Sequence, residues 1–336
     1  MKMRAKRSIA FLLMMIMIIT IFAGCGNTDK KDDKAEESPE ITESTPDVTA
    51  DGTETTDDAA GTSFTVTDMA GREVTFDTAI ERVVALTAAD CEILYAIGAG
   101  DLLVGRGAFC DYPEDVLAVP AVDSGAETNI EEVIALAPQV VLMSTMAQTE
   151  EQIATLENAG IKCVVSDAKD IAGVYTAIEL MGQLTDKNDE ASAIIADMKA
   201  VFEKVANDST GDGSETIYFE VSSMQWGDPW TSGSGTFMDE LATMVGLTNI
   251  FADVDGWQAI SQEQVIERDP DYILTIEMYF GDGPAPDEEI MSREGWQDIA
   301  AVKNGMVYNA AYNEIARPGP RLADAAKELY NFIYAS

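Results

Sequence analysis

Segments of strand length alternate with segments of helical periodicity along most of this chain, and this alternation limits the possible folds more than any other feature. The apolar run RVVALTA (82–88) leads into DCEILYAIGAG (90–100), whose apolar residues recur at helical spacing, and QVVLMS (139–144) is a further apolar run. Strands that alternate with helices favour a mostly parallel, doubly wound sheet. The alternation occurs twice, so we predict two doubly wound α/β lobes with a ligand cleft between them.

The stretch 171–206 separates the two alternating regions, because it has helical character almost throughout. We predict a long spine helix over 171–206, with a break at Thr185–Lys187, that joins an N-terminal lobe at 64–170 to a C-terminal lobe at 207–336. The N-terminal lobe opens with FTVTDMAGREVTF (64–76), in which apolar residues alternate on either side of a turn. This pattern is typical of a β-hairpin.

The N-terminus has the features of an export signal. Basic residues between Lys2 and Arg7 precede an apolar run, Ile9–Ala23, that is shorter than the roughly 20 residues of a membrane-spanning helix. The run ends in small residues directly before Cys25, which resembles a bacterial lipoprotein cleavage site. We therefore predict a lipoprotein signal peptide at 1–24 and lipidation of Cys25, which would anchor the protein to the extracytoplasmic face of the cell membrane. A permanent membrane span is the alternative.

Acidic residues dominate the charge of the chain and shape its next segment. Residues 25–62 have few apolar side chains and many acids, so we expect a disordered acidic tether between anchor and folded body. The whole chain has 21 Lys and Arg against 60 Asp and Glu, for a formal net charge of -39. Because binding to nucleic acid depends on attraction to its phosphates, this charge argues against a nucleic-acid partner.

The chain contains no histidine. This removes the commonest metal ligand and general base, together with every Ser-His or Cys-His nucleophile pair. We therefore expect no enzyme activity, no metal site and no resident cofactor. A metal-chelate-processing enzyme that uses Asp90, Asp111 or Glu220 as acid and base is the least favoured alternative.

Five segments, taken together and in order, carry a family resemblance. They are RVVALTAADCEILYAIGAGDLLVGRGAFCDYPEDV, NIEEVIALAPQVVL, WTSGSGTFMDELATMVGLTNIF, WQAISQEQVIERDPDYIL and RPGPRLADAAKELYNFIY. The chain resembles the substrate-binding lipoproteins of ABC importers, in the metal-chelate class that carries vitamin B12, ferric siderophores and haem. The resemblance implies a rigid two-lobed fold that binds a small-molecule metal chelate and delivers it to an ABC transporter permease dimer. A surface lipoprotein that binds or senses without transport is the alternative.

The loops at the predicted cleft are rich in aromatic residues and poor in bases, of which Arg106, Arg317 and Arg321 are the candidates. Because triscatecholate ferric siderophores carry a large negative charge, this balance favours a large planar or hydrophobic chelate. We predict ligand contacts for six residues: Tyr112, Trp230, Trp257, Tyr312, Arg317 and Arg321. For Arg321, in the first turn of a predicted helix, a structural ion pair is an equal alternative.

Three of these aromatic residues also guide the choice of ligand. Tyr112, Trp230 and Trp257 fall at positions similar to aromatic contacts of the vitamin B12-binding branch, although other aromatic positions of that branch are Ala126 and Ser144 here. The resemblance therefore favours a cobalamin or another corrinoid, with an iron siderophore or haem close behind. Each ring also has a structural alternative, such as packing on its own lobe.

The resemblance further implies one exposed glutamate on each lobe that docks on the permease. The matching residues are Glu131 in NIEEVIAL and Glu263 in SQEQVIER, with Asn129 and Ser261 as predicted N-caps. The alternative is that both glutamates only complement the helix dipole.

Three cysteines remain once Cys25 is lipidated. Cys163 lies in the apolar segment KCVVS and is predicted to be a buried thiol. Cys91 and Cys110 each follow a predicted strand at the same edge of the first sheet, and export permits oxidation. We therefore predict a possible disulfide between Cys91 and Cys110.

Overall fold

The structure, a computed structural model, describes residues 63–125, 127–145, 147–222, 227–276, 283–310 and 312–335. Residues 59–336 form one compact unit. The predicted signal peptide, the lipidated Cys25 and the acidic tether lie outside the described residues and stay predictions. Within the described residues, no helix has the length and apolar character needed to cross a bilayer.

The N-terminal part begins with the predicted hairpin, formed by β1 (Phe64–Thr67) and β2 (Glu73–Phe76). The two strands pair antiparallel with Phe64 opposite Phe76, and these two rings stack with centroids 5.2 Å apart. The alternation of apolar residues therefore places one face of the hairpin on the core, as the sequence predicts.

A five-stranded sheet follows, in the spatial order β5-β4-β3-β6-β7, with every neighbouring pair parallel. Its strands are β3 (Val83–Ala85), β4 (Leu103–Gly107), β5 (Ala121–Val122), β6 (Val140–Met143) and β7 (Lys162–Val165). Its helices are α1 (Ala88–Ala96), η1 (Gly100–Leu102), η2 (Glu114–Ala118), α2 (Ile130–Ala135) and α3 (Glu150–Asn158). The chain reverses its winding direction at the β3–β6 boundary, and ligands of such sheets bind beyond the carboxyl ends of the strands near this point.

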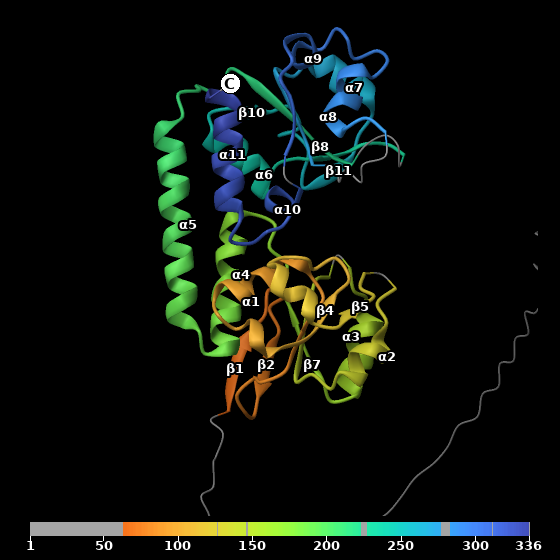
Figure 1. Ribbon diagram of the computed structural model, residues 1–336, viewed down its shortest axis with the longest axis vertical. Helices are drawn as coiled ribbons and strands as arrows, with labels where there is room; N and C mark the ends of the chain where they lie inside the picture. Colours follow the sequence, from red (N-terminus) through yellow and green to blue (C-terminus); the bar gives the residue numbers. More distant parts are fainter. Residues whose placement is uncertain are drawn as a thin grey trace, which may run out of the picture. The chain divides into compact units, whose positions relative to one another are not determined.

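The connection between the two sheets is a helical hairpin rather than one rod. Helix α4 (Ile171–Thr185) ends at Asp186, whose φ of 56° lies in the left-handed region, and α5 (Asn188–Asp208) begins two residues later. The predicted break is confirmed, and the long helix of the predicted spine is α5; the chain turns back at the break, so α4 packs beside α5 instead of continuing its axis. Gly182 permits the close approach, since a Cβ at that position would lie 2.8 Å from the Cβ of Ala191. Figure 1 shows that α5 runs beside both α4 and the C-terminal helix α11 (Leu322–Tyr334).

The second sheet is mixed rather than mostly parallel. Its strands are β8 (Thr216–Ser222), β9 (Trp230–Ser232), β10 (Thr248–Asn249), β11 (Trp257–Ala259), β12 (Tyr272–Thr275) and β13 (Val307–Asn309). Strands β10 and β12 run parallel to β8, and β13 runs parallel to β12, but β9 is antiparallel to β8 and to β11. The segments of β9 and β11 form strands that the alternation of strands and helices in the sequence does not reveal. Their Gly-rich flanks hide the period-2 pattern that identifies a strand.

The helices of this second part are short, apart from the last. They are α6 (Phe237–Met244), α7 (Gln262–Arg268), α8 (Pro286–Ser292), α9 (Ala300–Asn304), α10 (Tyr312–Ile315) and α11. Together with the two sheets and the helical hairpin, they confirm the predicted two-lobed α/β fold.

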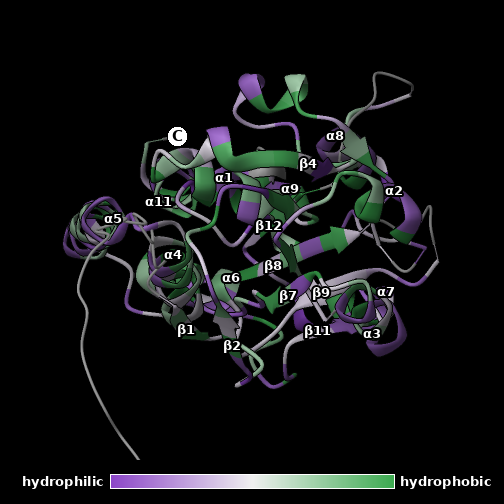
Figure 2. Ribbon diagram, turned by 90° about the horizontal axis from the view of Figure 1, so that it is seen from below, coloured by the Kyte–Doolittle hydropathy of each residue, from purple (hydrophilic) through white to green (hydrophobic). Residues whose placement is uncertain are grey.

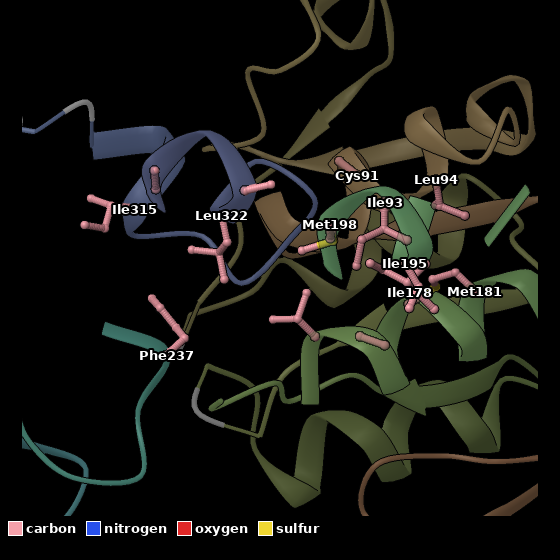
Figure 3. Close-up of a cluster of buried hydrophobic side chains, with 14 of the residues drawn as sticks. Cys91, Ile93, Leu94, Ile178, Met181, Ile195, Met198, Phe237, Ile315 and Leu322 are labelled. Atoms are coloured by element: carbon pink, nitrogen blue, oxygen red, sulfur yellow. The ribbon is translucent and has the colours of Figure 1, made fainter. Parts of the chain in front are cut away.

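The largest hydrophobic cluster of the described residues extends from the first sheet through the packed helices to the second sheet. Figure 3 shows Ile93 of α1, Ile178 of α4, Ile195 of α5 and Leu322 of α11 in this cluster. Separate clusters cover the opposite face of each sheet, so that neighbouring residues of a strand such as Val83 and Val84 belong to different clusters. Figure 2 shows hydrophilic residues along much of the outer helix α5. Both sheets are therefore buried on two faces, as doubly wound folds require.

Candidate functional site

The loop that follows β4 presents two aromatic rings to solvent. Phe109 is 70% exposed and Tyr112 is 45% exposed. Buried Arg106 shapes this loop, because its guanidinium donates to the carbonyls of Val119 at 3.1 Å and Cys110 at 2.9 Å. Arg106, one of the three bases that the sequence places near the predicted cleft, therefore supports the loop through backbone carbonyls.

Four charged side chains meet directly beneath this loop, and we call Glu92, Asp111, Arg317 and Arg321 the ion-pair cluster. Glu92 comes from α1 and is buried, whereas both arginines come from the segment between α10 and the start of α11. Nη1 of Arg317 lies 3.0 Å from Oε1 of Glu92 and 2.6 Å from Oδ1 of Asp111. Arg321 donates from Nε at 2.9 Å and from Nη2 at 2.6 Å to the two oxygens of Glu92.

The ion-pair cluster is joined to the exposed rings by two further contacts. Arg317 donates from Nη2 to the Phe109 carbonyl at 3.1 Å. The guanidinium of Arg321 lies over the Tyr112 ring, 3.9 Å from its centroid, in a cation–π contact. The structure thus brings Tyr112, Arg317 and Arg321 together and places both arginines in ion pairs, the alternative that the sequence left open for Arg321.

Burial lowers the pKa of Arg317, but the hydrogen bonds that it donates to Asp111 and Glu92 outweigh this effect and leave the pKa raised. The guanidinium is therefore charged at every physiological pH. A charge at this depth is stable only while its carboxylate partners are present.

The two predicted tryptophans of the second lobe lie on neighbouring strands. Trp230 opens β9 opposite Ala259 of β11 and is 46% exposed. Trp257 opens β11, is half-buried and packs on Phe237 of α6 with ring centroids 5.7 Å apart. Trp230 therefore has a free face for a ligand, whereas part of the Trp257 surface already belongs to the core.

Tyr312, the remaining predicted aromatic contact, is the first residue of α10. Its side chain lies outside what the structure describes, so its contact with a ligand stays a prediction. So do the ligand contacts of the other five residues.

A buried acid stands at the carboxyl edge of β3, near the point where the first sheet reverses its winding. Asp90 is 1% exposed, and neither of its carboxylate oxygens has a hydrogen-bond partner within the described residues. Burial raises the pKa of Asp90 from 3.8 to about 7. The hydroxyls of Thr87 and Ser166 offset part of this shift without forming a hydrogen bond of good geometry, and the charge of Asp167 adds to it.

The three described cysteines are all buried free thiols. The Sγ atoms of Cys91 and Cys110 converge on the carbonyl of Ala85, at 3.8 and 4.0 Å. The two cysteines are thus neighbours, but the predicted disulfide is not formed in the structure. Cys163 is a buried thiol as predicted, and burial raises its pKa to about 12.

Asp111 and Glu220, which with Asp90 are the acids of the enzyme alternative, are held in ion pairs. Asp111 belongs to the ion-pair cluster, and Glu220 binds Arg293 through two hydrogen bonds of 2.7 and 2.9 Å. Among the residues that the structure describes, no group of three or more Cys, Asp or Glu side chains is placed to hold a metal ion.

The two glutamates predicted to dock on a permease are exposed and lie in the first turns of α2 and α7. Asn129 and Ser261 are the N-caps of these helices, as predicted, and each accepts a hydrogen bond from a backbone N–H of the first turn. Because β11 runs parallel to β8, both helices begin near the carboxyl edge of their own sheet. Their role in docking stays a prediction.

Comparisons with known proteins extend these observations over the whole fold. A family described as "Periplasmic binding protein" matches residues 83–312. The chain is 32% identical to the uncharacterized ABC transporter substrate-binding lipoprotein YvrC of Bacillus subtilis (strain 168), over 99% of this chain and 98% of that protein. It is 26% identical to the vitamin B12-binding protein of Pectobacterium carotovorum, over 76% of this chain and 89% of that protein.

A solved structure shows the same architecture. The crystal structure of a possible iron-binding, periplasmic solute-binding protein from Staphylococcus epidermidis matches with a TM-score of 0.64 and 30% identity, and covers 76% of this chain and 99% of that one. The two-lobed α/β fold, the matched family and the relative aligned along almost the whole sequence all indicate the same family. The chain belongs to the periplasmic binding protein family, whose relatives here are substrate-binding proteins of ABC transporters.

Proposed function

We propose that this protein is an extracytoplasmic solute-binding lipoprotein that captures a metal chelate and delivers it to the permease dimer of an ABC importer. A cobalamin or another corrinoid is the favoured ligand, ahead of an iron siderophore or haem. The lipid on Cys25 would hold the protein on the extracytoplasmic face of the cell membrane. The similarity to a lipoprotein of an ABC transporter and to a vitamin B12-binding protein supports this proposal.

The observation that carries the proposal is the exposure of one aromatic ring at the carboxyl edge of the first sheet and another on the second. Tyr112 and Trp230 are each nearly half exposed although they are large and partly apolar. Side chains of this kind bind wide apolar ligand faces, and ligand sites combine such rings with a few polar groups. The ion-pair cluster supports Tyr112 from behind, so that its ring is held in place before a ligand arrives.

Replacing Tyr112 and Trp230 together by alanine should weaken the binding of cyanocobalamin about 100-fold, because aromatic anchors supply a large share of binding energy. Equilibrium dialysis of the purified protein against cyanocobalamin measures this change. The control is Met291→Ala, which removes an exposed apolar side chain of α8 and should leave the affinity unchanged. An unaltered affinity in the folded double variant would place the ligand elsewhere.

Docking on a permease predicts a second effect that is independent of ligand affinity. The double variant Glu131→Arg with Glu263→Arg should reduce uptake of the ligand into cells more than about tenfold, because it replaces two attractive charges by repulsive ones. Uptake of radiolabelled cobalamin by a strain that carries the variant is the measurement.

The matched control for docking is Glu150→Arg with Glu267→Arg. Both residues are exposed, and they lie in the first turn of α3 and the last turn of α7. This control should transport normally. Normal uptake by the Glu131 and Glu263 variant would assign both glutamates to the helix dipole alone.

A further inference from the structure

The arginines nearest to the exposed Tyr112 ring are all engaged by other groups of the protein. Arg317 and Arg321 share the buried carboxylate of Glu92, and Arg317 also binds Asp111. Arg106 is satisfied by backbone carbonyls. The guanidinium groups therefore face inward, toward partners within the protein, rather than toward a ligand.

The charges around Tyr112 balance without any ligand. The two guanidinium groups of the ion-pair cluster meet the two carboxylates of Glu92 and Asp111, and the carboxylate of Glu314 lies 3.8 Å from Nη1 of Arg321. The surroundings of the site are thus neutral to negative.

One cation near the carboxyl edge of the first sheet is not part of this balance. Lys169 lies on the segment between β7 and α4 and is exposed. Asp167 and Asp170 stand within two residues of it, so its charge is opposed locally. A single exposed lysine is also well screened by water and salt.

We propose that the carboxylates of Glu92 and Asp111 select the ligand by charge: they hold Arg317 and Arg321 in ion pairs behind Tyr112, so the site accepts chelates with no net negative charge and rejects anionic ones. This inference rests on the proposed function and narrows its substrate class. Glu92 acts here through the arginines and is buried, whereas Asp111 also presents a half-exposed carboxylate to an approaching ligand, and both are specificity-determining residues.

The physical basis is the strength of the existing ion pairs. An anionic chelate would gain from a guanidinium only if Arg317 left a buried carboxylate, which would then remain unpaired and costly. If the arginines stay in place, the anion meets the exposed edge of Asp111 and the field of a chain with a net charge of -39. Neutral or cationic chelates meet neither obstacle.

Matched ligands that share one chelate but differ in charge test this rule. One pair is cyanocobalamin and its dicarboxylate derivative, formed by hydrolysis of peripheral amides. The other pair is cationic ferrioxamine B and its anionic N-succinyl form, with ferric enterobactin as a strongly anionic probe. Affinities are measured by fluorescence quenching and equilibrium dialysis with the purified protein.

In the pair that binds, the anionic member should bind at least about tenfold more weakly than its partner. Ferric enterobactin should bind at least about 100-fold more weakly than the best ligand. Asp111→Asn removes one carboxylate from the partly exposed side of the cluster and should move the ratio of the two affinities about tenfold toward the anionic member. The control Glu114→Gln, an exposed acid in the neighbouring helix η2, should leave this ratio unchanged. Thermal unfolding checks that both variants are folded.

The outcomes separate this inference from the function on which it rests. Equal affinity of the wild type for both members of a pair, or tight binding of ferric enterobactin, would overturn the charge rule while chelate capture stands. If Asp111→Asn left the ratio of the two affinities unchanged, Asp111 would have no part in selecting ligands by charge. Failure of every probe to bind would overturn chelate capture and the charge rule with it.

Discussion

Replacing Arg293 by methionine is expected to lower the free energy of unfolding by about 3–5 kcal/mol, because it leaves the carboxylate of Glu220 buried without its partner. The side chains of Arg293 and Glu220 are only 4% and 1% exposed, and two hydrogen bonds of 2.7 and 2.9 Å join them. Arg293 also donates to Glu289 at 3.1 Å and lies 4.2 Å from the centroid of the Trp296 ring. Urea unfolding followed by circular dichroism measures the loss.

Two further variants separate this ion pair from a general effect of losing a charge. Lys204→Met removes an exposed ion pair with Asp208 on α5 and should change the free energy of unfolding far less than Arg293→Met does. Adding Glu220→Gln to Arg293→Met should recover part of the stability, because the second change removes the unpaired charge. If Arg293→Met cost no more than Lys204→Met, the buried pair would have no special role in the second lobe.

The second large effect is expected at Asp90 and depends on pH. The folded-state pKa of about 7 exceeds the ordinary value of 3.8, so the folded protein holds a proton that the unfolded chain has lost in this interval. The loss of stability caused by ionisation of buried Asp90 is therefore absent below pH about 4, grows as the pH rises, and is complete above pH about 7. Its full size is up to about 4 kcal/mol, as each pKa unit corresponds to about 1.4 kcal/mol.

Asp90→Asn should therefore be more stable than the wild type at pH 8 and about equally stable at pH 4. The difference between the two unfolding free energies at each pH isolates this residue from the many other acids of the chain. Asp101→Asn, at an exposed position in η1, is the control and should show no such trend. A difference that stays constant with pH would contradict an ionisation at Asp90 in this range.

Local interactions explain why much of the fold is predictable from the sequence. The alternation in FTVTDMAGREVTF specifies a hairpin because side chains of a strand alternate between its two faces. The N-caps Asn129 and Ser261 are predictable because each bonds a backbone N–H only three residues away. The apolar strands of the first sheet stand out since both of their faces are buried.

Strands β9 and β11 are not predictable in the same way. Each has three residues, and Gly233 directly after β9 is required by a backbone contact rather than by a turn pattern. A Cβ at Gly233 would lie 2.1 Å from the Val254 carbonyl oxygen, and the Gly233 N–H donates to the Gly256 carbonyl at 2.8 Å. These contacts arise only when the chain has already brought β9 and β11 together.

Some features of the candidate site are likewise predictable from the sequence, and others are not. The sequence by itself determined the two-lobed α/β class and the family, because periodicity and motif order are properties of short segments. It also predicted ligand contacts for Tyr112 and Trp230 from their residue type and the family resemblance. Only the tertiary structure decided what the arginines do, since Glu92 and Arg317 are 225 positions apart and nothing local indicates their pairing. The protonation of Asp90 depends in the same way on side chains packed around it from distant segments, because burial is a property of the folded chain.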